Sequence, residues 1–130
     1  MSLKLSSTNT SPYSYYSEGD GSNPITASVT LDNSGGTLDT NVVTAYLVAT
    51  TYSYTGITVQ PVNEETGIDW QISLDNATWA QSITPADMDA TAADQVVAVY
   101  LKAVVANDGT VDIGNYVAAD IQINATGNPA

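Results

Sequence analysis

The sequence predicts an all-β domain, an antiparallel sandwich of two sheets with about seven strands in total. Three observations lead to this fold class. Apolar residues alternate with polar ones almost everywhere, turn-forming residues interrupt the pattern at short intervals, and no long segment has a helical period. With 130 residues, 43% of them hydrophobic, the chain has the size of one domain with one core. The expected strands cover residues 25–31, 42–51, 57–62, 68–74, 78–83, 95–105 and 116–124.

Two of these segments carry most of the expected core. In residues 68–74, Trp70, Ile72 and Leu74 fall on one face, so we expect Trp70 to lie inside the sandwich. Residues 95–105 form the most apolar of the expected strands. Residues that tolerate turns and positive φ angles end the strands at 32–36, 75–76 and 107–109.

Other parts of the chain depart from the strand pattern. Residues 84–90 predict a short helical turn, with Thr84 as its N-cap and Pro85 at its first helical position. Pro61 marks the end of a strand or a sheet edge. The N-terminal stretch, rich in Ser, Tyr and Gly, is an irregular segment or an edge strand. The expected division of the chain is 1–23 for this segment, 24–126 for the sandwich domain and 127–130 for a tail.

The charge of the chain is strongly one-sided. It has 14 acidic and two basic residues, Lys4 and Lys102, and a formal net charge of −12. Such a chain repels phosphate groups and lacks the basic patch that nucleic acids and anionic membranes require. No apolar run reaches the ~18 residues that a spanning helix needs. We therefore expect neither nucleic-acid binding nor membrane insertion by this segment.

Several side chains that carry enzyme chemistry are missing. Because the sequence has no Arg, His or Cys, it has no Ser-His-Asp triad, no thiol nucleophile and no zinc site of the usual kind. No glycine-rich phosphate loop precedes a helix. We predict that the domain is not an enzyme and has no cofactor or metal site. The catalytic alternative is a carboxylate pair acting on a glycosidic bond, and the candidates are Glu64, Glu65, Asp69 and Asp87.

Calcium is the metal that the remaining ligands would suit, because its ligands are oxygen atoms. Asp87 with Asp89, and Asp108 with Asp112, have ligand-like spacing in expected loops. Neither pair completes the 12-residue calcium loop with its bidentate Glu. Whether either pair binds calcium is left open, and solvated loop acids are the simpler interpretation.

Three sequons and the aromatic residues offer further sites. Asn9, Asn76 and Asn124 are N-glycosylation sequons, and Asn76 in a hairpin turn is the best acceptor. Trp79 follows a turn and is a candidate platform for stacking on a sugar ring, whereas packing across the hairpin is the alternative. The tyrosines in less regular segments are Tyr13, Tyr15, Tyr16, Tyr52 and Tyr54.

Two stretches resemble a known family. Residues 69–79, DWQISLDNATW, are similar to a hairpin of immunoglobulin-like modules in prokaryotic surface proteins. Residues 100–105, 114–116 and 121–125 resemble the closing hairpin of such modules. The resemblance implies an Ig-like or fibronectin-III-like sandwich that is one unit of a cell-surface, adhesin or S-layer-type chain. It brings no catalytic residues with it, and it makes Tyr100 or Tyr116 a candidate tyrosine corner.

The expected function is therefore that of a non-catalytic structural or adhesive module in a secreted or cell-surface protein. No signal peptide is visible at the N-terminus, so we expect the domain to belong to a longer secreted chain. Loops 63–67 and 107–114 are the expected contacts with a protein partner or with other domains. A carbohydrate-binding module and a glycosidase-like fragment are the alternatives. A spacer would have its ends at opposite ends of the sandwich.

Overall fold

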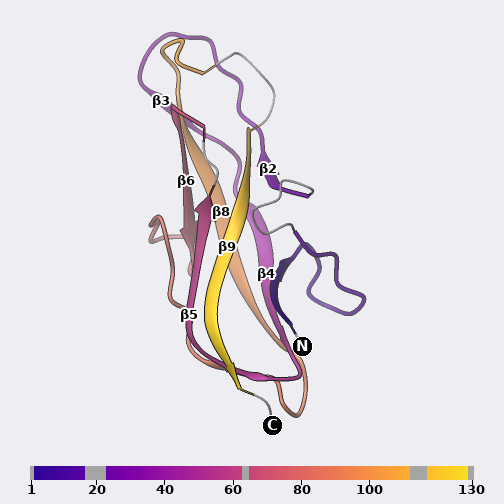
Figure 1. Ribbon diagram of the computed structural model, residues 1–130. Coiled ribbons are helices and arrows are strands. Elements are labelled where there is room, and N and C mark those ends of the chain that lie inside the picture. The colour runs from indigo at the N-terminus through magenta and orange to yellow at the C-terminus, as the bar shows by residue number, and fades with distance from the viewer. Residues whose placement is uncertain (1, 17–22, 63–64, 112–116, 129–130) are drawn as a thin grey trace.

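The structure is a computed structural model that describes residues 2–16, 23–62, 65–111 and 117–128 (Figure 1). Over these residues the chain forms strands and no helix, in two antiparallel sheets, so the predicted all-β class is confirmed. No helix in this described part could cross a membrane. The strands are β1 (Ser2–Ser6), β2 (Ile25–Ala27), β3 (Thr37–Asp39), β4 (Val43–Thr50), β5 (Ser53–Val62), β6 (Ile68–Ser73), β7 (Met88–Asp89), β8 (Gln95–Ala106) and β9 (Val117–Asn128).

Strand β8 lies at the centre of the five-stranded sheet. It pairs with β4 through residues 95–101 and with β3 through 104–106, while β6 pairs with residues 100–105. Because β6 shares partners with both β3 and β4, it lies on one side of β8, and β3 and β4 lie on the other. β1 extends this sheet beyond β4. The four-stranded sheet has the order β2-β9-β5-β7.

The core lies between the two sheets and follows the predicted alternation. Trp70 is fully buried, as the sequence predicted, and its neighbour Ile72 is buried with it. Strand β8 contributes every second residue to the core, and the four-stranded sheet adds side chains from β5 and β9. These buried residues include Val99, Leu101, Ala103, Val105, Ile57, Val59 and Ile121.

A β-bulge in β5 shifts which residues face the core. The pairing of β5 with β9 slips between Thr55 and Thr58, and Gly56 in the bulge has a φ of 61°. A positive φ is easily adopted by glycine because it has no Cβ. Before the bulge Tyr54 is buried, and after it the buried side chain is Ile57. The extra residue thus keeps apolar side chains in the core on both sides of the slip.

Two predicted elements around residue 80 are wrong. Residues 84–90 contain no helical turn, because Met88 and Asp89 form β7 and pair with β5. A single helical turn makes few hydrogen bonds of its own, and pairing with an existing strand is the better alternative. Residues 78–83 form no continuous strand, and only two bridges link them to strands. Ala80 pairs with Ile72 and Ile83 with Val59, so this segment crosses from one sheet to the other.

Other boundaries also differ from the prediction. The strand that begins at Ile25 ends at Ala27, although Leu31 is still buried. The sequence pattern did not predict β3. β9 continues to Asn128, past residue 124, where the pattern predicted its end. Leu74, expected on the core face, is 41% exposed because the chain leaves the sheet after β6.

Both described ends of the chain lie at the same end of the sandwich (Figure 1). Ser2 pairs with Thr50, and Asn128 pairs with Ser53, on the two sides of the β4–β5 turn. We call this end the terminal pole. The opposite end, the distal pole, consists of residues 32–36, 65–67 and 107–111.

Replacing Trp70 with Ala should lower the free energy of unfolding by about 3–5 kcal/mol, because it leaves a large cavity in the core. The matched variant Trp79→Ala removes a partly exposed indole and should cost only about 1 kcal/mol. Urea unfolding followed by circular dichroism measures both values. Equal losses in the two variants would contradict the placement of Trp70 in the core.

Candidate functional site

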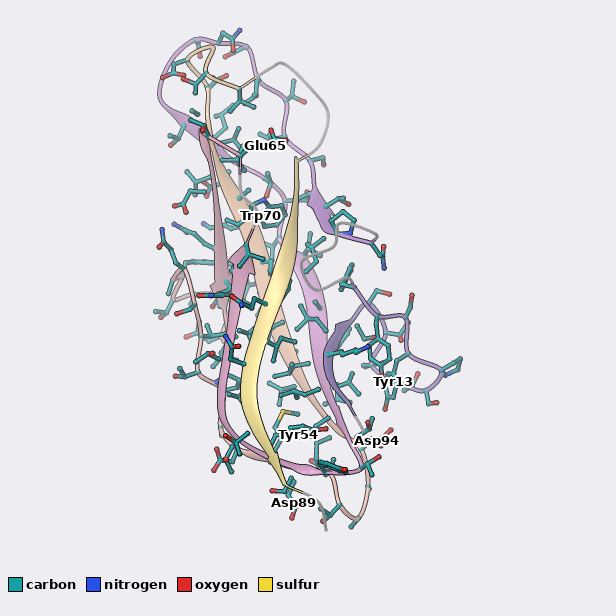
Figure 2. All side chains as sticks on the ribbon, in the orientation of Figure 1. Tyr13, Tyr54, Glu65, Trp70, Asp89 and Asp94 are labelled. Atoms are coloured by element: carbon teal, nitrogen blue, oxygen red, sulfur yellow. The ribbon has the colours of Figure 1, made fainter. Side chains whose placement is uncertain are left out.

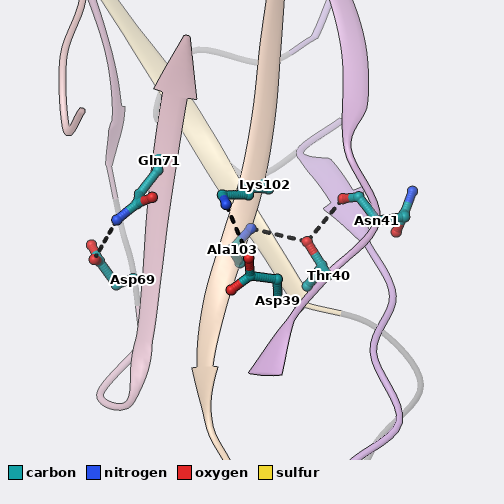
Figure 3. Close-up of polar contacts among 7 residues, drawn as sticks. All are labelled: Asp39, Thr40, Asn41, Asp69, Gln71, Lys102 and Ala103. Atoms are coloured by element: carbon teal, nitrogen blue, oxygen red, sulfur yellow. Dashed lines mark hydrogen bonds and ion pairs between the residues drawn. The ribbon is translucent and has the colours of Figure 1, made fainter. Parts of the chain in front are cut away.

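A polar cluster occupies the outer face of the five-stranded sheet around Lys102 (Figure 3). Lys102 points outward because its neighbours in β8, Leu101 and Ala103, are buried in the core. Residues from other elements surround it on this face. The Lys102 cluster consists of Asp39 (β3), Asp69 and Gln71 (β6), Trp79, Gln81 and Lys102 (β8).

The side chain of Lys102 contacts two members of the cluster and lies beside a third. Its Nζ lies 2.9 Å from Asp39 Oδ2 and 4.7 Å from the centroid of the Trp79 ring. Gln71 lies directly opposite Lys102 in the pairing of β6 with β8. The side chain of Lys102 is 18% exposed and that of Asp39 is 53% exposed, so water screens this ion pair and it adds little stability.

Asp69 links β6 to the segment that carries Trp79, which is also bridged to β6 by the pairing of Ala80 with Ile72. Its Oδ1 accepts a hydrogen bond from Gln81 Nε2 at 3.4 Å, and its Oδ2 accepts one from Gln71 Nε2 at 3.3 Å. The half-buried indole of Trp79 thus lies on a face that offers amide and carboxylate groups. Such a surface suits a neutral polar ligand better than an anion, because Lys102 is already paired with Asp39.

Of the carboxylates considered for glycoside hydrolysis, Glu65 and Asp87 lie at opposite ends of the sheets. Glu65 lies at the distal pole (Figure 2). Asp69 lies on the outer face of β6, since Ile68 and Trp70 on either side of it are buried. Asp87 is next to β7, which pairs with Ser53 and Tyr54 near the terminal pole. Glu64 lies outside the described residues. Among those that are described, no group of three or more acidic side chains could hold a metal ion.

The aspartates considered for calcium close local turns instead. Asp89 Oδ1 accepts hydrogen bonds from the backbone N–H and hydroxyl of Thr91, at 3.0 and 2.6 Å. Asp108 Oδ1 accepts the same pair from Thr110, at 3.0 and 2.6 Å. These bonds lower the pKa of both carboxyl groups. Asp112, the expected partner of Asp108, lies outside the described residues.

All three sequon asparagines are exposed. Asn76 lies in the turn after β6 with a φ of 59°, and Asn124 lies in β9. Asn9 lies in the N-terminal segment between β1 and Tyr15. Exposure makes each side chain accessible to a glycosyl transferase, and the use of the sequons stays a prediction.

Tyr13 and Tyr15 lie on the outer side of β1, whereas Tyr16 packs against the core. The hydroxyl of Tyr13 donates a hydrogen bond of 2.9 Å to Asp94, which precedes β8, and this bond raises the pKa of Tyr13 (Figure 2). The rings of Tyr13 and Tyr15 lie 5.9 Å apart, and Lys4 Nζ is 5.6 Å from the Tyr15 ring. Val48, which faces outward between Lys4 and Val96, is fully buried beneath this layer.

A second tyrosine pair lies at the terminal pole. The rings of Tyr52 and Tyr54 stack 6.4 Å apart, and the Tyr54 hydroxyl donates to the carbonyl of Thr50 at 3.2 Å. Tyr54 thus closes a turn in the way expected of Tyr100 or Tyr116. Tyr100 lies half-buried in β8, and Tyr116 lies outside the described residues. Within the described chain, no aromatic ring stacks beside Trp79.

The distal pole depends on Asn107, which the sequence marked only as a turn residue. Its side chain is 1% exposed. Its Oδ1 accepts hydrogen bonds from the backbone N–H groups of Asp32 and Asn33, at 3.0 and 2.9 Å. Its Nδ2 donates to Asp32 Oδ1 at 2.8 Å. This bond, together with bonds from Ser34, lowers the pKa of Asp32 to about 2.

The two loops predicted as contact regions meet at this pole. The backbone N–H of Ala106 donates to the carbonyl of Gly67 at 2.8 Å. A Cβ added at Gly67, whose φ is 86°, would lie 2.8 Å from Val111 Cγ2. Glycine at this position is therefore required by its backbone angle and by close packing. Residues 63–64 and 112–116 of the two loops lie outside the described part.

The variant Asn107→Ala should lower the free energy of unfolding at neutral pH by about 1–3 kcal/mol, because a buried hydrogen-bonding side chain is lost. It should also raise the pKa of Asp32 from about 2 toward 3.8. Because the pKa of Asp32 is depressed in the folded protein, its stabilising effect is present above pH 3.8 and lost as the pH falls through about 2.

The stability difference between the parent and Asn107→Ala should therefore shrink on acidification. Urea unfolding between pH 7 and pH 2, with NMR titration of the Asp32 carboxyl, measures both effects. The exposed variant Asn9→Ala is the control and should change neither quantity. An unchanged Asp32 pKa in Asn107→Ala would contradict the assigned cause.

Comparison with known proteins adds no relative, since no family model, no curated protein and no solved structure matches the chain. The structure shows a two-sheet, all-β fold that is compatible with a β-sandwich. The closer likeness to immunoglobulin or fibronectin-III modules stays a prediction.

Proposed function

We propose that the chain is a non-catalytic, Ig-like interaction module of a secreted or cell-surface protein, held at its terminal pole and binding a protein partner through its distal pole. The observation that carries this proposal is the position of the two ends. Ser2 and Asn128 both lie next to the β4–β5 turn, and the loops at the distal pole lie at the other end of the sheets.

This arrangement favours a domain that projects from its parent chain over a spacer within a linear array of domains. A spacer in a linear array of domains needs its ends at opposite poles, and this sandwich has them at one. A domain with neighbouring ends projects from the chain that carries it, as inserted domains do. We therefore favour an adhesive or recognition role over a purely spacing one.

The chemistry of the distal pole favours a basic partner. Asp32, Glu65 and Asp108 are exposed there. Both basic residues of the chain lie elsewhere, Lys4 in β1 and Lys102 in the middle of β8. Together with the net charge of −12, this gives a negative field that attracts and orients a positively charged protein surface. The separation of Asp87, near the terminal pole, from Glu65, at the distal pole, supports a non-catalytic role (Figure 2).

An array of secreted and cell-surface proteins, probed with the labelled domain, tests the proposal. We expect binding to basic proteins that weakens as the salt concentration rises. Binding should be lost in Glu65→Lys and kept in Asp94→Lys, which makes the same charge change of two units near the terminal pole (Figure 2). Equal loss in both variants would overturn the assignment of the distal pole.

A second candidate function is carbohydrate binding by the Lys102 cluster. It is favoured by the half-buried indole of Trp79 among the hydrogen-bonding side chains of Asp69, Gln71 and Gln81. Sugar rings stack on indole faces, and their hydroxyl groups bind amides and carboxylates.

A glycan array, run with calcium and again with a chelator, tests this second candidate. If the cluster binds sugars, Trp79→Ala should abolish binding, and Tyr52→Ala near the terminal pole should leave it unchanged. Signals that survive in Trp79→Ala would exclude the cluster as the site.

A further inference from the structure

Part of the edge of β8 is open near the terminal pole. β6 pairs with β8 only from Tyr100 to Val105, because the chain turns away after Ser73. On the opposite side, β4 continues along β8 down to Gln95. In the described part of the chain, nothing pairs with residues 95–99 on the side that β6 leaves free.

The backbone groups that face this open side are identified by the hydrogen bonds farther along β8. The carbonyl of Ala103 accepts a hydrogen bond from the N–H of Thr40, and the N–H of Ala103 donates to Thr40 Oγ1. The backbone groups of odd-numbered residues of β8 therefore point toward β3 and β4. Ala106 donates to Gly67, so even-numbered residues point toward the side of β6. The pairing with β4 continues without a bulge from residue 101 to 95. The N–H and C=O groups of Val96 and Ala98 therefore face the open edge.

An apolar groove of about 510 Å³ lies beside this edge. Its walls include Leu74, Pro85, Met88 and Val97, and Leu74 is 41% exposed. The groove opens between the two sheets, since Val97 belongs to β8 and Met88 belongs to β7 of the other sheet. A strand placed along the open edge would cover this gap between the sheets.

The rim of the groove is acidic. Asp87 and Asp89 line it, and both are exposed. A second copy of this chain would bring the same carboxylates, and its own charge of −12, against them. A peptide carrying Lys or Arg is complementary to the rim instead.

We propose that an extended peptide of a partner protein, with apolar residues alternating with Lys or Arg, adds to β8 beside residues 95–99 as an extra strand. Its backbone pairs with Val96 and Ala98, and every second side chain enters the groove. This surface lies near the terminal pole and is separate from the distal pole, so the two binding modes are independent.

Titration of the ¹⁵N-labelled domain with the synthetic peptide acetyl-Lys-Val-Lys-Val-Lys-Val-Lys-amide tests the proposal. We expect amide hydrogen exchange at Val96 and Ala98 to slow by about tenfold at saturation, because both groups become hydrogen-bonded. The Met88 methyl signal should shift as the groove fills. The peptide with Glu in place of Lys should bind at least about tenfold more weakly.

The variant Ala98→Pro tests the open edge most directly. Because the N–H of Ala98 points to the open side, Ala98→Pro removes no bond within the sheet, and the variant should fold with an unfolding midpoint near that of the parent. Ala98→Pro should lose peptide binding, because the proline ring removes the N–H that would donate to the peptide and blocks the open edge of β8. The matched variant Ala98→Val keeps the N–H and should bind the peptide like the parent. Val97→Pro removes a bond to β4 and should destabilise the domain.

Several results would overturn the proposal. They are binding that persists in Ala98→Pro, unchanged exchange at Val96 and Ala98, equal binding of the Glu peptide, and dimer formation in sedimentation experiments that Ala98→Pro abolishes. Failure of Ala98→Pro to fold, with Val97→Pro folding normally, would show that the assigned backbone directions are reversed. None of these measurements involves Glu65 or Asp108, so they are separable from a failure of the distal-pole proposal.

Discussion

The pairing of β8 on both of its sides is the constraint on which the rest of the structure depends. Its odd-numbered residues from Val99 to Val105 are fully buried, so its even-numbered residues must face outward. This alternation places Lys102 on the outer face, where it forms an ion pair with Asp39 of β3 on one side and lies opposite Gln71 of β6 on the other. The same alternation directs the backbone groups of β8 either to β4 or to β6. Because β6 is shorter than β8, the backbone groups near the start of β8 have no strand beside them on the side of β6.

Four of the aspartates stabilise local turns and do not form a common site. Asp32, Asp75, Asp89 and Asp108 each accept a hydrogen bond from the backbone N–H two residues later. Such turns need an acceptor on a short side chain, which aspartate supplies. The strands between the turns keep these carboxylates apart, and so the negative charge is spread over both poles. A dispersed charge of this kind acts on a partner through its long-range field.

The two proposed binding surfaces would bind their partners through different interactions. At the distal pole, Asn107 holds the turn at residues 32–34 in one conformation, so exposed acids are presented on a fixed frame. At the open edge of β8, unpaired backbone groups and an apolar groove would contribute directional bonds and burial. Exposed edges also invite unwanted pairing between chains. The acidic rim of the groove and the high net charge oppose such self-association.

The sequence by itself determined the all-β class, the position of most strands, the turns and the burial of Trp70. These features depend on local alternation and on the turn chemistry of neighbouring residues, and both can be seen in a short window of sequence. Only the tertiary structure decided that residues 78–83 cross between the sheets, that Met88 joins β5, and that both ends share a pole. It also brought Lys102 to Asp39 across 63 positions of the chain. Contacts between distant segments depend on strand order and register, which local alternation does not encode.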